Sequence, residues 1–153
     1  MDGFHLDDGV LDALDRRDRK GAPDTFDAAG YVQLLRRLRA RDEEVVYAPV
    51  FSRQQEQALA GALPVPATVP LVVTEGNYLL ADGPFRPVRE LLDETWFLDV
   101  DPALRRRRLI ARHVAHGRSP DAAERWVADS DDRNAVLVDA TARRADLVVR
   151  AVG

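Results

Sequence analysis

The chain has 153 residues, the usual size of one domain, with 46% hydrophobic and 31% charged residues, a composition that argues against disorder. It has no cysteine, which excludes a disulfide framework, a thiolate zinc site and a cysteine nucleophile. The net charge of −4, together with the lack of a long apolar run or a basic leader segment, predicts a cytoplasmic protein that binds neither nucleic acid nor membranes.

The first part of the chain is polar and then turns helical. Residues 2–26 are rich in aspartate and glycine, which predicts turns and loops with one short helical turn near residues 7–16. Asp27 is placed to cap a helix over residues 28–41, in which apolar side chains recur at helical spacing.

The middle of the chain predicts short strands. Residues 45–48 predict a strand that Pro49 ends, and the proline-interrupted stretch 52–70 predicts a connection with at most a short helix. The apolar runs 71–74 and 95–100 lack polar alternation, which is typical of strands covered on both faces.

The rest of the chain alternates helices with strands. Asp101 and the following proline begin a helix, and Gly117 is placed to end it. This order predicts an α/β fold with a mostly parallel sheet and flanking helices. The remaining predicted elements are helices at 87–92, 102–116 and 120–140 and a last strand at 147–149.

Glu75 follows the predicted strand 71–74 directly and precedes Gly76. A buried carboxylate is unfavourable unless it is paired or bound to a metal, and parallel sheets bind ligands beyond the carboxyl ends of their strands. Two interpretations stay open. The carboxylate could orient magnesium beside a nucleotide, or it could pair with an arginine at a strand edge.

Arginines form a row on the predicted helix after Asp101. Arg105, Arg108 and Arg112 are three and four residues apart, so they share one face, and Arg118 follows just beyond Gly117. Guanidinium groups suit polyphosphates because each presents a planar fork to oxyanions. The alternative is a solvated face that pairs with the many aspartates. Nucleic-acid binding by this helix is disfavoured by the net charge and by the lack of interleaved aromatic residues.

Histidines and the first aspartate give weaker signals. By spacing alone, Asp2 indicates a turn residue and His5 a loop residue. His113 and His116 lie three apart on a predicted helix, but no third metal ligand is evident.

Seven short motifs occur in order along the chain, at residues 2–5, 19–27, 48–51, 73–80, 97–101, 105–118 and 145–149. Together they resemble the P-loop kinases grouped with uridine kinase, pantothenate kinase and phosphoribulokinase. The most similar branch is that of the bacterial nucleoside/nucleotide kinase-like proteins, or fructose-transport-associated sugar kinases. The resemblance covers the chain from Met1 to about Val149.

The resemblance implies catalytic and cofactor-binding roles, with ATP and Mg²⁺ as cofactors. Asp2 matches the acid that acts as general base or orients the acceptor hydroxyl, and Glu75 takes the place of the magnesium-orienting acid. Arg112 is expected both to bind ATP and to neutralise charge in the transition state, because phosphoryl transfer depends on alignment and electrostatic stabilisation. The arginines matched to the lid over the ATP phosphates are Arg105, Arg108, Arg112 and Arg118.

The resemblance also implies an acceptor site. Phe4 and His5 would line its pocket, and the loop with Arg19 and Lys20 matches a lid on the acceptor side. The full set of expected substrate-binding residues is Phe4, His5, Arg19, Lys20, Phe51, Arg53, Asn77 and Tyr78.

Two departures from the family pattern affect these expectations. Uridine kinases carry an Asp and then a His after the motif at 48–51, whereas this chain reads Ser-Arg-Gln-Gln-Glu at 52–56, which does not support a pyrimidine nucleoside as acceptor. No Gly-x-x-x-x-Gly-Lys-Ser/Thr occurs in the chain, and the family carries it upstream of the position matched by Met1. We therefore expect residues 1–153 to be a single domain, the C-terminal portion of a P-loop kinase without its first strand–P-loop–helix unit. Without that strand, residues 71–74 and 96–100 would expose apolar edges.

Two functions are compatible with the sequence. The first is an ATP-dependent small-molecule kinase, or its truncated C-terminal part, a phosphotransferase acting on a hydroxyl of a sugar, nucleoside or pantothenate-like acceptor. The second is a non-catalytic binding or regulatory remnant that no longer uses ATP. A homodimer is compatible with both.

Overall fold

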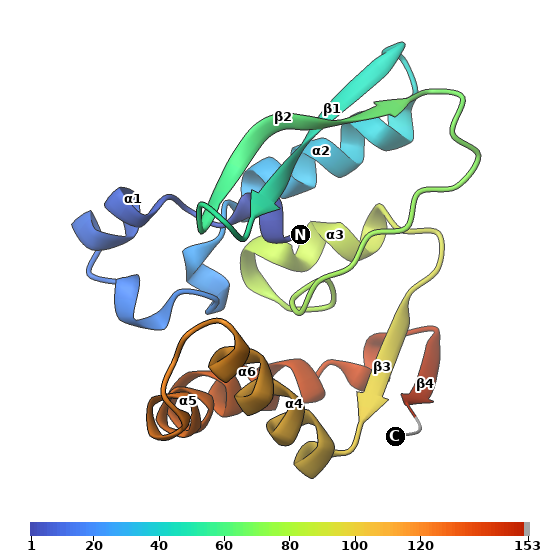
Figure 1. The fold of residues 1–153 in the computed structure, drawn as a ribbon. Helices are drawn as coiled ribbons and strands as arrows, with labels where there is room; N and C mark the ends of the chain where they lie inside the picture. Colours follow the sequence, from blue (N-terminus) through green and yellow to red (C-terminus); the bar gives the residue numbers. More distant parts are fainter. Residues whose placement is uncertain (152–153) are drawn as a thin grey trace. The chain divides into compact units, whose positions relative to one another are not determined.

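The computed structural model describes residues 1–151, which fall into two compact units, residues 1–93 and 94–151 (Figure 1). The expectation of a single domain stays a prediction. Within the described residues, no helix combines the length and the apolar character needed to cross a membrane.

The first unit consists of three helices and a β-hairpin, joined by short 3₁₀ turns. The predicted helix over 28–41 is confirmed as α2, and the Asp27 side chain caps it by accepting a hydrogen bond of 2.8 Å from the Gly30 nitrogen. The helix predicted at 87–92 is confirmed as a shorter α3. The elements are α1 (Asp8–Ala13), α2 (Ala28–Ala40), β1 (Val45–Ser52), β2 (Gln57–Pro66) and α3 (Arg86–Glu90).

Strands β1 and β2 pair antiparallel, from Val45 opposite Pro66 to Ser52 opposite Gln57 (Figure 1). The predictions of a strand ending at Pro49 and of a connection over 52–70 are therefore wrong. Proline interrupts a strand only where its missing N–H is needed by a neighbour. Both strands of a two-stranded sheet are edge strands, and Pro49 lies where the register shifts between Ala48 and Val50.

Residues 71–74 do not form a strand, and the prediction of a run buried on both faces is wrong. Leu71 is 72% exposed and Val73 83% exposed. The cause is the lack of a pairing strand for this run among residues 1–151. The run is held through its last residue, because the Tyr31 hydroxyl and Thr74 Oγ1 are hydrogen-bonded at 2.7 Å.

The core of the first unit lies between α2 and its neighbours. Helix α2 contacts both β1 and α3. Its residues Tyr31, Val32 and Leu35 are buried. Burial of their apolar surface stabilises the contact between helix and hairpin. The other buried residues of this core include Val46, Ala48, Tyr78, Phe85 and Val88.

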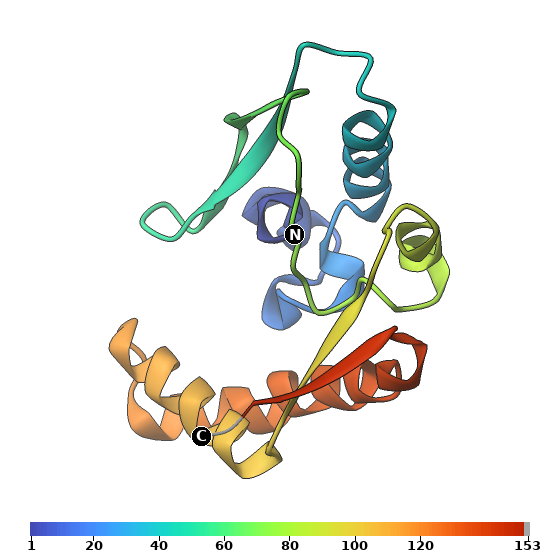
Figure 2. The ribbon, with the colours of Figure 1, turned by 90° about the vertical axis from the view of Figure 1, so that its right-hand side faces the viewer.

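The second unit is a strand–helix–strand arrangement, visible in Figure 2 as the yellow and red strands beside the orange helices. Strand β3 (Trp96–Val100) pairs in parallel with β4 (Leu147–Ala151), which confirms the α/β class with a parallel pair and flanking helices. The intervening helices are α4 (Pro102–Ala115), α5 (Pro120–Trp126) and α6 (Asp132–Asp139).

Three details of the second unit bear on the sequence-based predictions. Gly117, with φ of 95°, follows the end of α4 as predicted. The helix predicted over 120–140 is present, but a π-helical turn, Val127–Asp131, separates α5 from α6. The prediction that β3 is buried on both faces is wrong, since Trp96 is 66% and Leu98 63% exposed.

Candidate functional site

The turn that carries Asp2 is packed tightly between two other segments of the first unit. A Cβ atom added at Gly3 would lie 2.5 Å from the carbonyl oxygen of Pro49 in β1. A Cβ added at Gly76 would overlap the side chain of Met1. Glycine at position 3 therefore permits a close approach to the backbone of β1, and glycine at position 76 leaves room for the Met1 side chain.

This packing brings Asp2 and Glu75 into one region. The Met1 nitrogen donates a hydrogen bond of 2.7 Å to the Glu75 carbonyl oxygen and lies 3.4 Å from Glu75 Oε1. The Glu75 side chain is 83% exposed, so its carboxylate faces solvent rather than an arginine partner. Of the two interpretations of Glu75, pairing with an arginine at a strand edge is not what the described residues show.

His5 is held against the Asp2 turn. Its Nδ1 lies 2.8 Å from the carbonyl oxygen of Asp2, and because a carbonyl oxygen only accepts, Nδ1 carries the proton. Burial lowers the pKa of His5 below 6.5, partly offset by this hydrogen bond and by the Asp2 charge. A neutral ring then has its lone pair on Nε2.

An aromatic cluster, made of His5, Phe26, Phe51, Tyr78 and Phe85, lies beside this turn. Phe26 is at its centre, with its ring centroid 4.0 Å from that of His5 and 5.8 Å from that of Tyr78. His5 also contacts Phe51 at 5.1 Å, and Tyr78 contacts Phe85 at 5.7 Å. The structure thus brings together three predicted acceptor-side residues, His5, Phe51 and Tyr78. Tyr78 is only 1% exposed and supports the cluster from within.

Phe4 points to a neighbouring contact rather than into the aromatic cluster. Its ring meets that of Tyr31 edge-on, with centroids 5.2 Å apart. Burial raises the pKa of the Tyr31 hydroxyl, which stays protonated and bonded to Thr74. Phe4 thereby anchors the Asp2 turn to α2.

Lys20 lies at the edge of the aromatic cluster. Its Nζ is 2.6 Å from Asp8 Oδ1 and 2.9 Å from the Glu56 carbonyl oxygen. It also lies 5.5 Å from the centroid of the Phe51 ring. Lys20 therefore joins α1 to the tip of the hairpin next to a predicted acceptor residue.

The other expected acceptor-side residues lie apart from the aromatic cluster. Arg19 is paired with Asp24 at 2.7 Å. Arg53 and Asn77 are exposed, and within residues 1–151 neither side chain makes a hydrogen bond or an ion pair. Their predicted roles thus depend on a bound acceptor.

In the second unit, the arginines of α4 fall into two groups. Arg105 lies 3.3 Å from both carboxylate oxygens of Asp139, and Arg106 is hydrogen-bonded to Asp132. Arg108 and Arg112 are exposed and have no ion-pair partner in the described part of the chain. The predicted row therefore contains two arginines that are open to an anion and one that already has a carboxylate partner.

Arg118 is placed differently from the arginines of α4. Its guanidinium carbon lies 3.9 Å above the centroid of the Trp126 ring. The Trp126 ring in turn meets the His113 ring edge-on at 6.4 Å, and His113 Nε2 lies 2.9 Å from Asp131 Oδ2. His113 is thus engaged by an aspartate.

A metal ion would find few protein ligands in either unit. Within residues 1–151, no group of three or more His, Asp and Glu side chains could hold a metal ion. Mg²⁺ is commonly bound by one or two carboxylates, with phosphate oxygens and water completing the shell. An exposed carboxylate such as that of Glu75 fits this mode of binding. It does not require a site in which protein side chains supply all the ligands.

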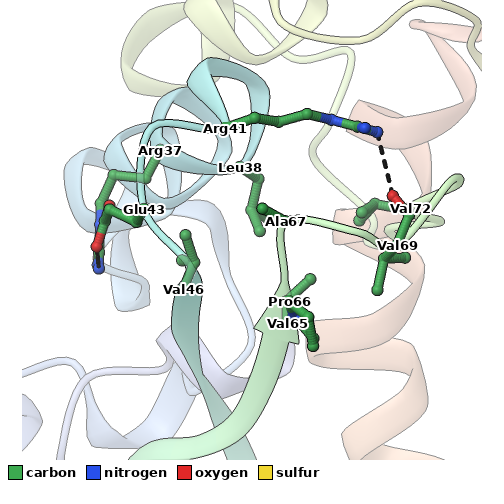
Figure 3. A pocket seen from close by; sticks show the side chains of 10 residues that line it. All are labelled: Arg37, Leu38, Arg41, Glu43, Val46, Val65, Pro66, Ala67, Val69 and Val72. Carbon is green, nitrogen blue, oxygen red and sulfur yellow. Dashed lines mark hydrogen bonds and ion pairs between the residues drawn. The ribbon is translucent and has the colours of Figure 1, made fainter.

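A shallow pocket of about 280 Å³, open solvent included, lies elsewhere in the first unit (Figure 3). It is formed between the end of α2 and the hairpin, where Leu38, Val46 and Val65 give it apolar walls. Arg41 closes one side by donating a hydrogen bond of 3.1 Å to the Val69 carbonyl oxygen. None of the predicted site residues lines it, so we do not assign the site to this pocket.

Asp8, Phe26 and Trp126 contribute to these contacts without a sequence signal that predicts a role for them. Asp8 was hidden among many aspartates, although Lys20, the only lysine among 22 basic residues, needs a partner when half-buried. Phe26 lies within the motif at residues 19–27, but the resemblance implies no role for it. No local signal links Trp126 to Arg118, because the stack depends on the turn after α4.

Three comparisons place the chain among known proteins. No protein-family model matches it. The "Uncharacterized protein YggC" of Escherichia coli (strain K12) is 37% identical over 150 residues, which cover 97% of this chain and 61% of that protein. The "ATP-dependent kinase-like protein notR'" of Aspergillus versicolor is 35% identical over 145 residues, covering 88% of this chain and 84% of that protein.

A solved structure is also similar to this chain. The crystal structure of a "putative fructose transport system kinase" from Silicibacter sp. TM1040 matches with a TM-score of 0.90 and 37% identity, over 97% of this chain and 72% of that one. The chain spans less than two thirds of the length of YggC.

Proposed function

The chain belongs to the P-loop kinase family of these relatives, and on this premise we propose that it transfers the γ-phosphoryl group of ATP to a hydroxyl group of a small molecule. The observation that carries the proposal is the packing of the Asp2 turn against Pro49 and next to Glu75. Two carboxylates in one region provide for the two needs of the reaction, a base for the acceptor and a ligand for the metal ion.

Asp2 is proposed to accept the proton of the acceptor hydroxyl. Its side chain is exposed, and its backbone is fixed by the hydrogen bond from His5 Nδ1 and by the contact of Gly3 with Pro49. A base held in this way can align the hydroxyl oxygen with the phosphorus atom, and alignment is a large part of catalysis in phosphoryl transfer.

Glu75 is proposed to hold Mg²⁺ together with phosphate oxygens and water. When bound, the ion would neutralise charge on the transferring phosphoryl group. The Glu75 carboxylate is available for this because its only ionic contact among the described residues is the long one to the Met1 nitrogen.

The acceptor is proposed to lie against the exposed side of the aromatic cluster. The rings of His5 and Phe51 contact each other, and Lys20, which is paired with Asp8, lies beside Phe51. Sugars, nucleosides and pantothenate-like molecules all combine an apolar face with hydroxyl groups, which suits such a surface.

The second unit is proposed to bind the ATP phosphates through arginine. Arg108 and Arg112 are the arginines of the predicted row with free donors, and each can offer two parallel N–H groups to an oxyanion. Arg105 can contribute only by leaving Asp139.

Calorimetric titration with MgATP tests the proposal most directly. Saturable binding, followed by ATP consumption in the presence of sugars, nucleosides or pantothenate, is the expected result. Absence of any MgATP binding would contradict it. The remaining interpretation would then be a binding or regulatory module that no longer uses ATP.

A further inference from the structure

Arg118 and Trp126 form a cation–π pair in which the guanidinium group lies over the indole ring. The guanidinium carbon lies over the face of the Trp126 ring, 3.9 Å from its centroid, within the range of a cation–π contact. All five N–H donors of arginine lie in the plane of the guanidinium group and point outward from its edge. The contact with the Trp126 ring holds the Arg118 side chain, while among the described residues none of these donors makes a hydrogen bond.

Two arginines of α4 differ from Arg118 because their N–H groups are bound to carboxylates. Arg105 and Arg106 direct N–H groups at the carboxylates of Asp139 and Asp132. Their donors are used and their charge is compensated. Within the described residues, the Arg118 side chain has no hydrogen bond or ion pair, so its charge and its donors are both available.

We propose that Trp126 is a positioning residue, which holds Arg118 with its donor edge open to a polyphosphate oxyanion. The inference deepens the proposed function and rests on it, because it takes the ligand to be the phosphate chain of ATP. It adds a residue that no motif of the sequence indicated.

The Trp126 ring is itself held by a second contact. His113 on α4 meets the ring edge-on at 6.4 Å, and the imidazole is fixed by Asp131 at 2.9 Å. Trp126 directly precedes the π-helical turn Val127–Asp131, and Asp131 is the last residue of that turn. Single π-helical turns widen a helix locally and frequently occur at functional sites.

Two consecutive aspartates, at the end of the π-helical turn and the start of α6, contact side chains of α4. Asp131 contacts His113 and Asp132 contacts Arg106, and these two partners are seven residues apart, two turns of the helix. These contacts dock the last residue of the π-helical turn and the first residue of α6 on α4. The Trp126 ring is therefore fixed relative to the helix that carries Arg108 and Arg112.

The test measures the affinity for inorganic tripolyphosphate by calorimetry in Trp126→Leu, Trp126→Phe, Arg118→Ala and the double variant Trp126→Leu/Arg118→Ala. Trp126→Leu removes the stack and should weaken binding about fivefold, as expected from the strength of a cation–π contact. Trp126→Phe keeps an aromatic face and should stay within about twofold of the parent. The double variant should bind no more weakly than Arg118→Ala, because Trp126 acts only through Arg118.

The matched control is Arg107→Ala, which removes an exposed arginine of α4 that lies off the row of Arg105, Arg108 and Arg112. It should leave the affinity within about twofold of the parent. Equal loss in Trp126→Phe and Trp126→Leu, or additive losses in the double variant, would overturn the positioning role while leaving phosphate binding intact. A parent protein that binds neither tripolyphosphate nor MgATP would overturn the proposed function together with this inference.

A second measurement needs no ligand and tests whether Arg118 contacts Trp126 in solution. In a Trp96→Phe background, Trp126 is the only indole of the chain, since the sequence has two tryptophans. Arg118→Ala should then change the Trp126 fluorescence emission, and Arg107→Ala should not. An unchanged emission in Arg118→Ala would show that the stack does not form in solution.

Discussion

The phenolic hydroxyl group of Tyr78 donates a hydrogen bond of 2.6 Å to the carbonyl oxygen of Gly21, which joins two segments 57 residues apart in the sequence. Gly21 has φ of 104°, and its nitrogen donates a hydrogen bond of 2.9 Å to Thr25 Oγ1. The loop that carries Arg19 and Lys20 is thus fixed on both sides of Gly21. The conformation of this loop therefore depends on Tyr78, three residues after Glu75.

Tyr78→Phe should lower the free energy of unfolding by about 1–2 kcal/mol, because the Gly21 carbonyl oxygen loses its partner in a half-buried position. Urea unfolding followed by circular dichroism measures this. Tyr47→Phe is the matched control, since the Tyr47 side chain is 57% exposed on β1 and should change stability by less than about 0.5 kcal/mol. Equal effects of the two substitutions would contradict the structural role of the bond.

The His5 environment predicts a pH dependence of stability. Burial lowers the pKa of His5 in the folded state below 6.5, so as the pH falls through 6.5 the unfolded chain takes up the proton first. Stability should be full above that pH and decrease as the pH falls towards the pKa of the folded state. His5→Phe keeps the ring contacts and removes the titration, so the difference in unfolding free energy between parent and variant should change between pH 7.5 and 5.5. A constant difference would contradict the prediction.

The two tightly packed glycines should differ in their response to alanine. At Gly3 the added Cβ meets the backbone of Pro49, which cannot move aside without distorting β1, and we expect a loss of about 1–3 kcal/mol in stability. At Gly76 the added Cβ meets the Met1 side chain, which can rotate away, so the loss should be smaller. Thermal unfolding of both variants makes the comparison, and a larger loss for Gly76→Ala would be the contrary result.

The proposed base role of Asp2 predicts a separation of turnover from nucleotide affinity. Asp2→Asn should lower the rate of phosphoryl transfer by about 10²- to 10⁴-fold, the usual contribution of a general base, and leave the dissociation constant for MgATP within about twofold. The control Asp18→Asn alters an exposed aspartate without an ion pair among the described residues. Unchanged turnover in Asp2→Asn would remove Asp2 from the catalytic machinery.

The two groups of arginines on α4 predict different effects on ATP binding. Arg112→Ala should raise the dissociation constant for MgATP by about tenfold with little change in stability, because Arg112 has free donors and no partner to leave unpaired. Arg105→Ala should have the smaller effect on affinity, since Arg105 already faces Asp139. Calorimetry separates the two, and the reverse order would contradict the assignment.

Most helices could be predicted from local signals. Asp27 and Asp101 each cap a helix by accepting a hydrogen bond from the backbone three residues on, and both were recognisable from the sequence. The π-helical turn could not be predicted, because its docking contacts to α4 bring together residues 18 and 26 positions apart in the sequence.

The strands were harder to predict because a strand depends on its neighbour. The prolines of β1 and β2 signal interruption, yet both strands form because each is an edge of the hairpin. Residues 71–74 have the composition of a buried strand, but composition does not supply a pairing partner. Leu71 and Val73 are consequently exposed.

The candidate site was accessible mainly through the resemblance to P-loop kinases. Spacing alone made Asp2 a turn residue and His5 a loop residue, and the structure places both in the packed turn beside Glu75. The stack of Arg118 on Trp126 lay beyond sequence reasoning, because it depends on the path of the chain after α4.

The π-helical turn at Val127–Asp131 also has a consequence for changes in chain length. Such a turn accommodates one residue more than an α-helix of the same rise. Deleting one residue there would let α5 and α6 merge into a continuous α-helix, and the residues after the deletion would keep close to their present side of the axis because the turn had absorbed the extra residue. Asp132 would then still face Arg106, so the shortened chain should retain this ion pair with α4.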